Sequence, residues 1–283
     1  MDPFDPTFDD CAWNDAWLRF PIIQVLPGVY PSFTVRSWEM TEADICGQTV
    51  RLTPPLAVRG LITPDGTLWM SDVPQERLMM FNNAAAARGR TLVGGLGLGL
   101  YPQYAMPRVS AMTIIERDPA LIRVVGPVVE VAAAAHNVPV EMQQGDIHEV
   151  LAAAPTVRYD TIFLDTWETL DAAHLPYINT LRDLAIPHLA PGGRVLLWGY
   201  RWMVRLFEGA CERLLRLEPG RRHDWLAVMT RQHPAVWALL LPVVEHFAGQ
   251  EVERMDEALD WCRRCAATLR PGPGAAPGMA STP

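Results

Sequence analysis

Residues 91–116 read TLVGGLGLGLYPQYAMPRVSAMTIIE, and this stretch decides the fold class. An apolar run leads into a glycine-dense turn, Gly94 to Gly99, and a second apolar run ends on Glu116. We predict a strand, a glycine turn, a helix and a second strand that carries an acid at its end. Glycine has no Cβ and tolerates positive φ, so backbone there can approach a ligand closely. The stretch therefore predicts the first half of a nucleotide-binding α/β unit.

The pattern continues beyond residue 116. Apolar runs that favour strands occur at 139–142, 159–164 and 194–198, and segments that favour helices occur at 119–137, 147–153 and 175–189. Alternation of strands and helices is typical of a parallel sheet with right-handed crossovers. We expect an α/β fold, specifically a Rossmann-like, doubly wound and mostly parallel sheet.

Four segments are expected along the chain. An N-terminal region, 1–85, contains short strands at 32–38, 48–53, 56–62 and 67–71, which form a small β-hairpin module, and a helix at 73–88 with Asp72 as its N-cap. The Rossmann-like domain follows at 86–200. Residues 201–270 form a C-terminal helical segment, for which a lid, a homodimer surface or a cover for the sheet edge all stay open. The Pro/Gly/Ala-rich tail, 271–283, is predicted to be disordered.

Composition narrows the class of protein. The chain has 283 residues, a net charge of -8 and a pI near 5.4, with no basic stripe, which argues against nucleic acid as a partner. No run of about 18 apolar residues predicts a membrane span. Five cysteines do not resemble a disulfide framework, so we expect a reducing, cytoplasmic location. The Cys262–Cys265 pair lacks further ligands at metal-binding spacing, so no metal site is predicted.

The glycine spacing separates two classes of nucleotide. The dinucleotide pattern G-x-G-x-x-G fails, because its last position falls on Leu100 or Pro102. An S-adenosylmethionine site fits instead, with the turn facing the methionine part and Glu116 holding the ribose. Asp146 would accept the adenine amine, and Asp165 would lie near the sulfonium. Each feature alone has a structural explanation, such as packing or a helix N-cap; their order and spacing favour a site.

The run VGGLGLG…IIERD…GDI…YDTIFLD…LAPGGRVLL resembles class I S-adenosylmethionine-dependent methyltransferases, especially their spermidine-synthase-like branch, over residues 58–199. The resemblance implies S-adenosyl-L-methionine as cofactor, a small-molecule acceptor and no membrane partner. The cofactor-binding residues that it implies are Gly94, Gly95, Leu96, Gly97, Gly99, Glu116, Arg117, Asp146, Ile147 and Asp165.

The chain departs from the aminopropyltransferases of that branch. Their hairpin Gln falls near Trp69, and their Tyr-His pair near Leu78-Met79, whereas an acid does recur at Glu168, three residues after Asp165. Asp165 and Glu168 are the candidate catalytic bases, ahead of the nearest imidazoles, those of His148 and His174. We expect methyl transfer to a small molecule. Aminopropyl transfer, cofactor binding without catalysis and a nicotinamide-dependent oxidoreductase stay open as alternatives.

Overall fold

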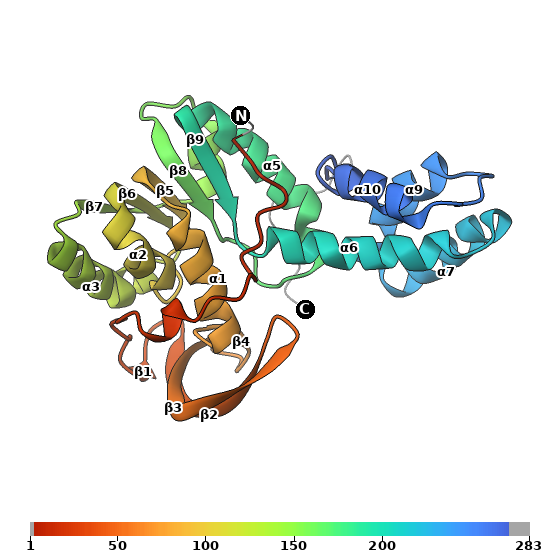
Figure 1. Ribbon diagram of the computed structural model, residues 1–283. Coiled ribbons are helices and arrows are strands. Elements are labelled where there is room, and N and C mark those ends of the chain that lie inside the picture. The colour runs from red at the N-terminus through yellow and green to blue at the C-terminus, as the bar shows by residue number, and fades with distance from the viewer. Residues whose placement is uncertain (1–2, 272–283) are drawn as a thin grey trace. The chain divides into compact units, whose positions relative to one another are not determined.

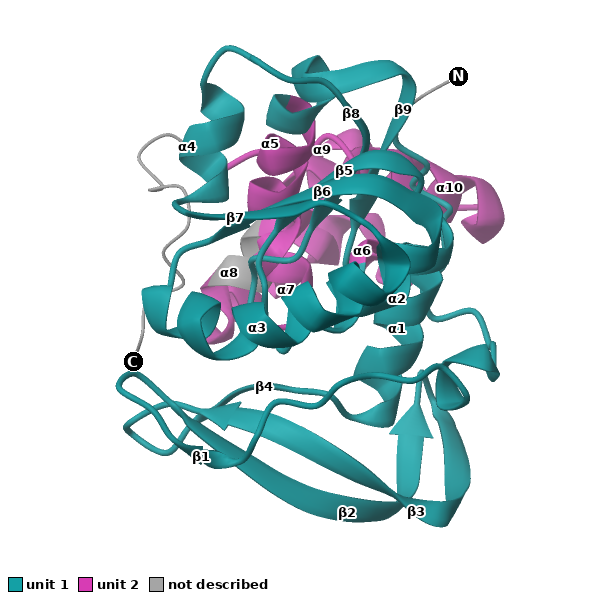
Figure 2. Ribbon diagram, turned by 90° about the vertical axis from the view of Figure 1, so that its left-hand side faces the viewer, with its two compact units in different colours: residues 1–168, 184–199 teal, residues 169–183, 200–283 magenta. Residues whose placement is uncertain are grey.

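The computed structural model describes residues 3–271, apart from the side chains of residues 235, 236 and 238. The chain forms two compact units, residues 1–168 with 184–199 and residues 169–183 with 200–283 (Figure 2). The expected four segments are thus divided differently: the β-hairpin module and the parallel sheet share one unit, and residues 169–183 belong with the C-terminal helices. The tail predicted to be disordered lies, from residue 272 on, outside the described residues.

A five-stranded parallel sheet forms the centre of the first unit (Figure 1). Its strand order is β7-β6-β5-β8-β9, so the chain runs outward from β5 to one edge and then from β8 to the other. The Rossmann-like fold class is confirmed, and the reversal of strand order lies between β5 and β8, where such sheets bind ligands. The strands are β5 (Gly89–Gly94), β6 (Val109–Glu116), β7 (Val140–Gln144), β8 (Tyr159–Leu164) and β9 (Leu189–Leu197).

Helices of this unit connect and flank the strands. Asp118 caps α3 as its side chain accepts the N–H of Ala120 at 2.7 Å. No membrane span was predicted, yet the 18-residue α3 is long and apolar enough to cross one; it contacts β6, β7 and α2 as a layer of this fold. The elements are η1 (Ala16–Leu18), α1 (Pro74–Ala85), α2 (Leu100–Ala105), η2 (Met106–Arg108), α3 (Pro119–His136), α4 (Ile147–Ala152) and η4 (Ile186–His188).

The predicted hairpin module is a four-stranded antiparallel sheet in the order β1-β2-β3-β4. The strands are β1 (Gly28–Val29), β2 (Thr34–Ile45), β3 (Gln48–Ile62) and β4 (Leu68–Ser71). The two predicted strands at 48–53 and 56–62 are one long strand, in which the β2–β3 register shifts between Met40 and Glu42 and leaves residues 52–55 outside the pairing. Such an irregularity accommodates Pro54 and Pro55, which have no N–H to donate.

Asp72 does not cap the helix that follows it, contrary to the prediction. Val73 is the N-cap of α1, while the carboxylate of Asp72 accepts the N–H of Arg59 and binds the Arg77 guanidinium at 2.6 Å. Both side chains are buried, and Arg77 also donates to the carbonyl of Ala57. The Asp72 carboxylate binds the buried Arg77 guanidinium and does not cap the helix. This ion pair joins α1 to the antiparallel sheet.

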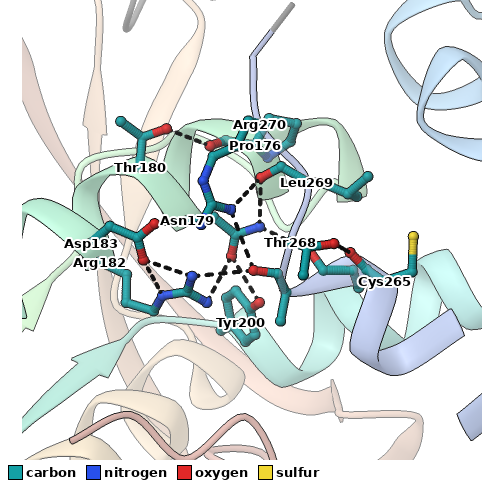
Figure 3. Close-up of polar contacts among 12 residues, drawn as sticks. Pro176, Asn179, Thr180, Arg182, Asp183, Tyr200, Cys265, Thr268, Leu269 and Arg270 are labelled. Carbon is teal, nitrogen blue, oxygen red and sulfur yellow. Dashed lines mark hydrogen bonds and ion pairs between the residues drawn. The ribbon is translucent and has the colours of Figure 1, made fainter. Parts of the chain in front are cut away.

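The second unit is helical, as predicted for 201–270, and Pro234 and Pro242 lie in the first turns of α8 and α9. Asn179 of α5 donates to the carbonyls of Ala266 and Leu269 and accepts the Tyr200 hydroxyl at 2.9 Å (Figure 3). This buried amide thus joins three segments of the unit. The elements are η3 (Ala172–His174), α5 (Leu175–Ala185), α6 (Tyr200–Leu215), η5 (Pro219–Arg221), α7 (Arg222–Gln232), α8 (Pro234–Trp237), η6 (Ala238–Leu240), α9 (Leu241–His246) and α10 (Met255–Ala266).

The cysteines differ from expectation in one respect. Cys11 and Cys46 form a disulfide with their Cα atoms 5.9 Å apart, although the cysteine pattern predicted no such bond. Cys262 and Cys265 are buried free thiols on α10, and Cys211 of α6 is a third. The disulfide ties the N-terminal segment to the end of β2.

Candidate active site

The glycine turn begins where β5 ends. Gly95 has a φ of +94°, and its N–H donates to the carbonyl of Ile115 at 2.9 Å. A Cβ on Gly95 would lie 2.2 Å from the backbone oxygen of Asp165. Gly99, with a φ of +74°, is the N-cap of α2. The turn therefore requires glycine for two reasons. The backbone of Asp165, directly after β8, packs against the turn, and a ligand needs close access to it.

Glu116 lies at the carboxyl end of β6, beside this turn. Its Oε2 accepts the N–H of Leu96 at 2.9 Å, its Oε1 accepts the N–H of Asp118 at 2.8 Å, and the residue is 9 % exposed. Each carboxylate oxygen has a further lone pair. The acid is thus held in one orientation by backbone, with acceptor capacity left for two hydroxyl groups.

The Gly145-Asp146-Ile147 segment follows β7. The N–H of Gly145 donates to the carbonyl of Glu116 at 3.0 Å, which brings this loop to the same edge of the sheet. Asp146 caps α4, since its Oδ1 accepts the N–H of His148 at 2.8 Å. Ile147 is buried, and its Cγ1 would meet a Cβ on Gly94 at 2.7 Å. The structural role of Asp146 uses one oxygen and leaves the other for a ligand.

Asp165 follows β8, and its N–H donates to the carbonyl of Gly94 at 2.9 Å. Asp165 lines a cleft with Gly95, Leu96 and Gly97. Burial, and next the charges of Glu116 and Asp10, raise the pKa of Asp165 to about 8. This carboxyl group can therefore exchange a proton near neutral pH, as a general base must.

A second acid in the cleft was missed by the sequence analysis. Glu76 of α1 lines the same cleft as Asp165. Burial raises the pKa of Glu76 well above its usual range, followed by the charges of Asp165, Asp10 and Asp72. Glu76 lies in the helix before the glycine motif. The one sequence signal that could have indicated its role is its position in the first turn of the helix that follows the hairpin module.

Asp10 was missed as well. It is 1 % exposed, and its Oδ2 accepts the N–H of Gly199 at 2.8 Å and the side-chain amide of Asn83 at 2.9 Å. Burial chiefly raises the pKa of Asp10 to about 6. The N-terminal segment, to which the sequence assigned no role, thus places a carboxyl group near Glu76 and Asp165.

The remaining wall of the cleft is apolar and aromatic. Tyr101 of α2 stacks on Phe163 of β8 with ring centroids 3.7 Å apart. The Tyr101 side chain is 2 % exposed, and its hydroxyl has no hydrogen-bond partner among the described residues. Methionine and leucine side chains complete the wall: Met70, Met80, Leu98 and Leu100. No lysine, arginine or histidine is among the described residues that line it.

Other sequence candidates lie elsewhere. Glu168 is exposed and is not one of the described residues that line the cleft. Arg117 is exposed directly after Glu116, and His148 is half-buried on α4. His174 belongs to the second unit, where its Nε2 lies 3.0 Å from the Thr169 hydroxyl. The cleft therefore combines Asp165 with Glu76 and not with the acid predicted beside it.

No protein-family model matches this chain, and no curated protein matches it. Among solved structures, the N-methyltransferase NodS from Bradyrhizobium japonicum is 18% identical over 46% of this chain and 76% of its own, with a TM-score of 0.34. A SAM-dependent methyltransferase from Thiobacillus denitrificans, solved with S-adenosyl-L-homocysteine, is 17% identical over 44% of this chain, with a TM-score of 0.34. The match spans about half of that second protein, 48%.

Proposed function

We propose that this protein binds S-adenosyl-L-methionine and transfers its methyl group to a small-molecule acceptor. One observation carries the proposal: the described residues that line the cleft at the β5–β8 switch point include two acids, Glu76 and Asp165, and no lysine, arginine or histidine. The negative electrostatic potential of these acids favours binding of a cationic nucleoside and opposes binding of the pyrophosphate of a dinucleotide. This charge argues for a sulfonium cofactor over NAD or FAD, in agreement with the glycine spacing.

The residues fit the cofactor part by part. Glu116 would accept the two ribose hydroxyls on its remaining lone pairs, and the free oxygen of Asp146 would accept the adenine amine. Gly94, Gly95, Leu96, Gly97 and Gly99 would border the methionine part, with Arg117 and Ile147 flanking the nucleoside. The fit is supported by hydrogen bonds that already hold Glu116 and Asp146 at one edge of the sheet.

When bound, the cofactor supplies a methyl group on a positively charged sulfur, and a neutral thioether leaves. The chain's own task is to hold donor and acceptor in line. Asp165 would take the proton that the acceptor loses, since its raised pKa matches that role. The apolar wall from Met70 to Phe163 would limit the access of water to the reacting atoms.

Methyl transfer is favoured over aminopropyl transfer. Leu78 and Met79, at the positions where the aminopropyltransferases have a Tyr-His pair, are fully buried apolar side chains. They offer no polar atom to a polyamine. The transferred group is therefore expected to be the methyl group.

Two measurements test the proposal. Calorimetry should detect binding of S-adenosyl-L-homocysteine and none of NAD(P)H; the reverse result rules it out. Mass spectrometry after incubation with S-adenosyl-L-methionine, and separately with its decarboxylated form, should find S-adenosyl-L-homocysteine and not methylthioadenosine as the by-product. Methylthioadenosine as the main by-product would instead favour aminopropyl transfer.

A further inference from the structure

We infer that Glu76 and Asp165 act as one carboxyl pair that binds the protonated amine of the acceptor, so that the acceptor is an apolar amine and the product an N-methylamine. The inference rests on the proposed function and names the substrate class of that site. It assigns to Glu76, which no cofactor motif contains, a role in acceptor recognition.

The position of the two acids is the first support. They come from different elements, α1 and the end of β8, and line one cleft together. No ion pair joins either acid to a cation among the described residues, and the guanidinium of Arg77, which follows Glu76 on α1, is bound to Asp72. Burial and the charge of Asp165 raise the pKa of Glu76, so the two acids do not both ionise easily and the pair retains a proton. An ammonium group would supply the missing positive charge.

An unpartnered polar group is the second, independent support. The Tyr101 hydroxyl is buried in the wall of the cleft and donates to no described residue. Burial raises the pKa of Tyr101 above its usual range, so the hydroxyl stays protonated and able to donate. A buried donor without a partner indicates that a ligand completes the site.

The other side chains of the wall are apolar and favour an amine with an apolar substituent. The Tyr101–Phe163 stack and the side chains of Met70, Met80 and Leu98 offer apolar contact beside the acids. An ammonium group attached to an apolar body matches this combination. A polyamine would place a second charge against the apolar wall at a cost in desolvation.

The carboxyl pair also accepts the proton that the amine loses before it reacts. A protonated amine has no lone pair, so it must transfer one proton to the ionised pair before it reacts. Each unit by which the pKa of the acid approaches that of the amine makes this transfer tenfold more favourable. The neutral nitrogen then attacks the methyl carbon, and the carbon–sulfur bond breaks with its electrons going to sulfur. The product is an N-methylammonium ion, a neutral thioether and a protonated pair that returns its proton to water.

The charged groups that shift the pKa values of the pair are acids, and they act in the same direction. Asp10 from the N-terminal segment, Asp72 before α1 and Glu116 of β6 each raise the pKa of Glu76 or Asp165. The guanidinium of Arg77, on the same helix as Glu76, is engaged by Asp72. Affinity for an ammonium ion should therefore rise as the pH passes through about 8, the pKa of Asp165.

The test uses 2-phenylethylamine and its neutral analogue 2-phenylethanol as probes, with the full chain saturated with S-adenosyl-L-homocysteine. Calorimetry at pH 8.5 should show the amine binding at least tenfold more tightly than the alcohol. Glu76→Gln should abolish this preference, Glu76→Asp should restore part of it, and Glu130→Gln, at an exposed position on α3, should leave it unchanged. Equal binding of amine and alcohol to the wild-type chain would overturn the inference.

A second arm separates the acceptor from the donor, whose methionine part also has an ammonium group. Methylthioadenosine lacks that group. If Glu76→Gln weakens S-adenosyl-L-homocysteine but not methylthioadenosine, the pair binds the donor and our assignment is wrong; unchanged affinity for both supports it. Failure of the wild-type chain to bind S-adenosyl-L-homocysteine would instead refute the proposed function itself. Because Glu76→Gln removes a carboxyl group from like charges, we expect no loss of thermal stability at pH 8.5.

Discussion

The Oε2 atom of Glu116 accepts a hydrogen bond of 2.9 Å from the backbone N–H of Leu96. This bond joins the end of β6 to the glycine turn after β5, so the acid that would hold the ribose also orders the turn that would border the methionine part. Because this part of the site is already ordered, less conformational entropy is lost when a ligand binds.

Glu116→Gln should weaken S-adenosyl-L-homocysteine by about 1–3 kcal/mol, because the amide replaces one acceptor oxygen by a donor. Calorimetry measures the change. Glu130→Gln, an exposed acid on the neighbouring helix, is the matched control and should bind normally. Unchanged affinity in Glu116→Gln would remove this acid from the site.

Asp146 allows its two roles to be separated. Asn also caps helices, so Asp146→Asn should keep the stability of α4 while its amide donor faces the adenine amine and lowers affinity by about 1–3 kcal/mol. Asp146→Ala should lose both the cap, about 1 kcal/mol of stability, and the affinity. Thermal unfolding and calorimetry on both variants provide the comparison. If Asp146→Asn binds like the wild-type chain, the acid is a cap only.

Gly95→Ala should destabilise the chain by more than the usual cost of a positive φ, about 1–2 kcal/mol. The added Cβ would meet the backbone oxygen of Asp165 at 2.2 Å. Gly66→Ala is the matched control, because its φ of +90° is nearly that of Gly95, +94°, and nothing lies within 4 Å of its Cβ. Equal losses in urea unfolding would show that the contact with Asp165 is not rigid.

Stability should fall as pH rises from about 4 to about 8. Asp10 and Asp165 have a usual pKa of 3.8 and reach about 6 and about 8 in the folded chain. The folded state therefore binds more protons than the unfolded state across this window, and their stabilising effect is present below pH 3.8 and lost as pH passes each folded pKa. Asp165→Asn should flatten the fall between about pH 6 and pH 8 in urea titrations. An identical pH profile in the variant would contradict the raised pKa of Asp165.

The buried Asp72–Arg77 pair positions the start of α1, the helix that carries Glu76. Arg77→Met should cost about 3–5 kcal/mol, because it leaves the Asp72 carboxylate buried without its cation. The exposed Arg19–Asp15 pair is the control, and Arg19→Met should cost at most about 1 kcal/mol. Urea unfolding compares the two variants, and similar losses would argue that Asp72 is neutral in the folded chain.

The sequence by itself determined the parallel sheet, the glycine turn, and the acids Glu116, Asp146 and Asp165 at the ends of strands. Periodicity and turn chemistry are local properties, and in a parallel sheet strand ends meet at one edge, so these residues converge without further information. The length of β3 and the cap of α1 were predicted incorrectly, because strand register and a buried ion pair overrode local preference.

Only the tertiary structure decided the composition of the cleft. Glu76 comes from a helix before the motif and Asp10 from the N-terminal segment, and neither has a spacing relation to Asp165 that a sequence pattern could contain. They act on Asp165 and on each other through electrostatic interactions, whose strength depends on distance and burial. The glycine turn indicated a nucleotide; its acidic surroundings, supplied by distant segments, favour a cationic nucleoside and an amine beside it.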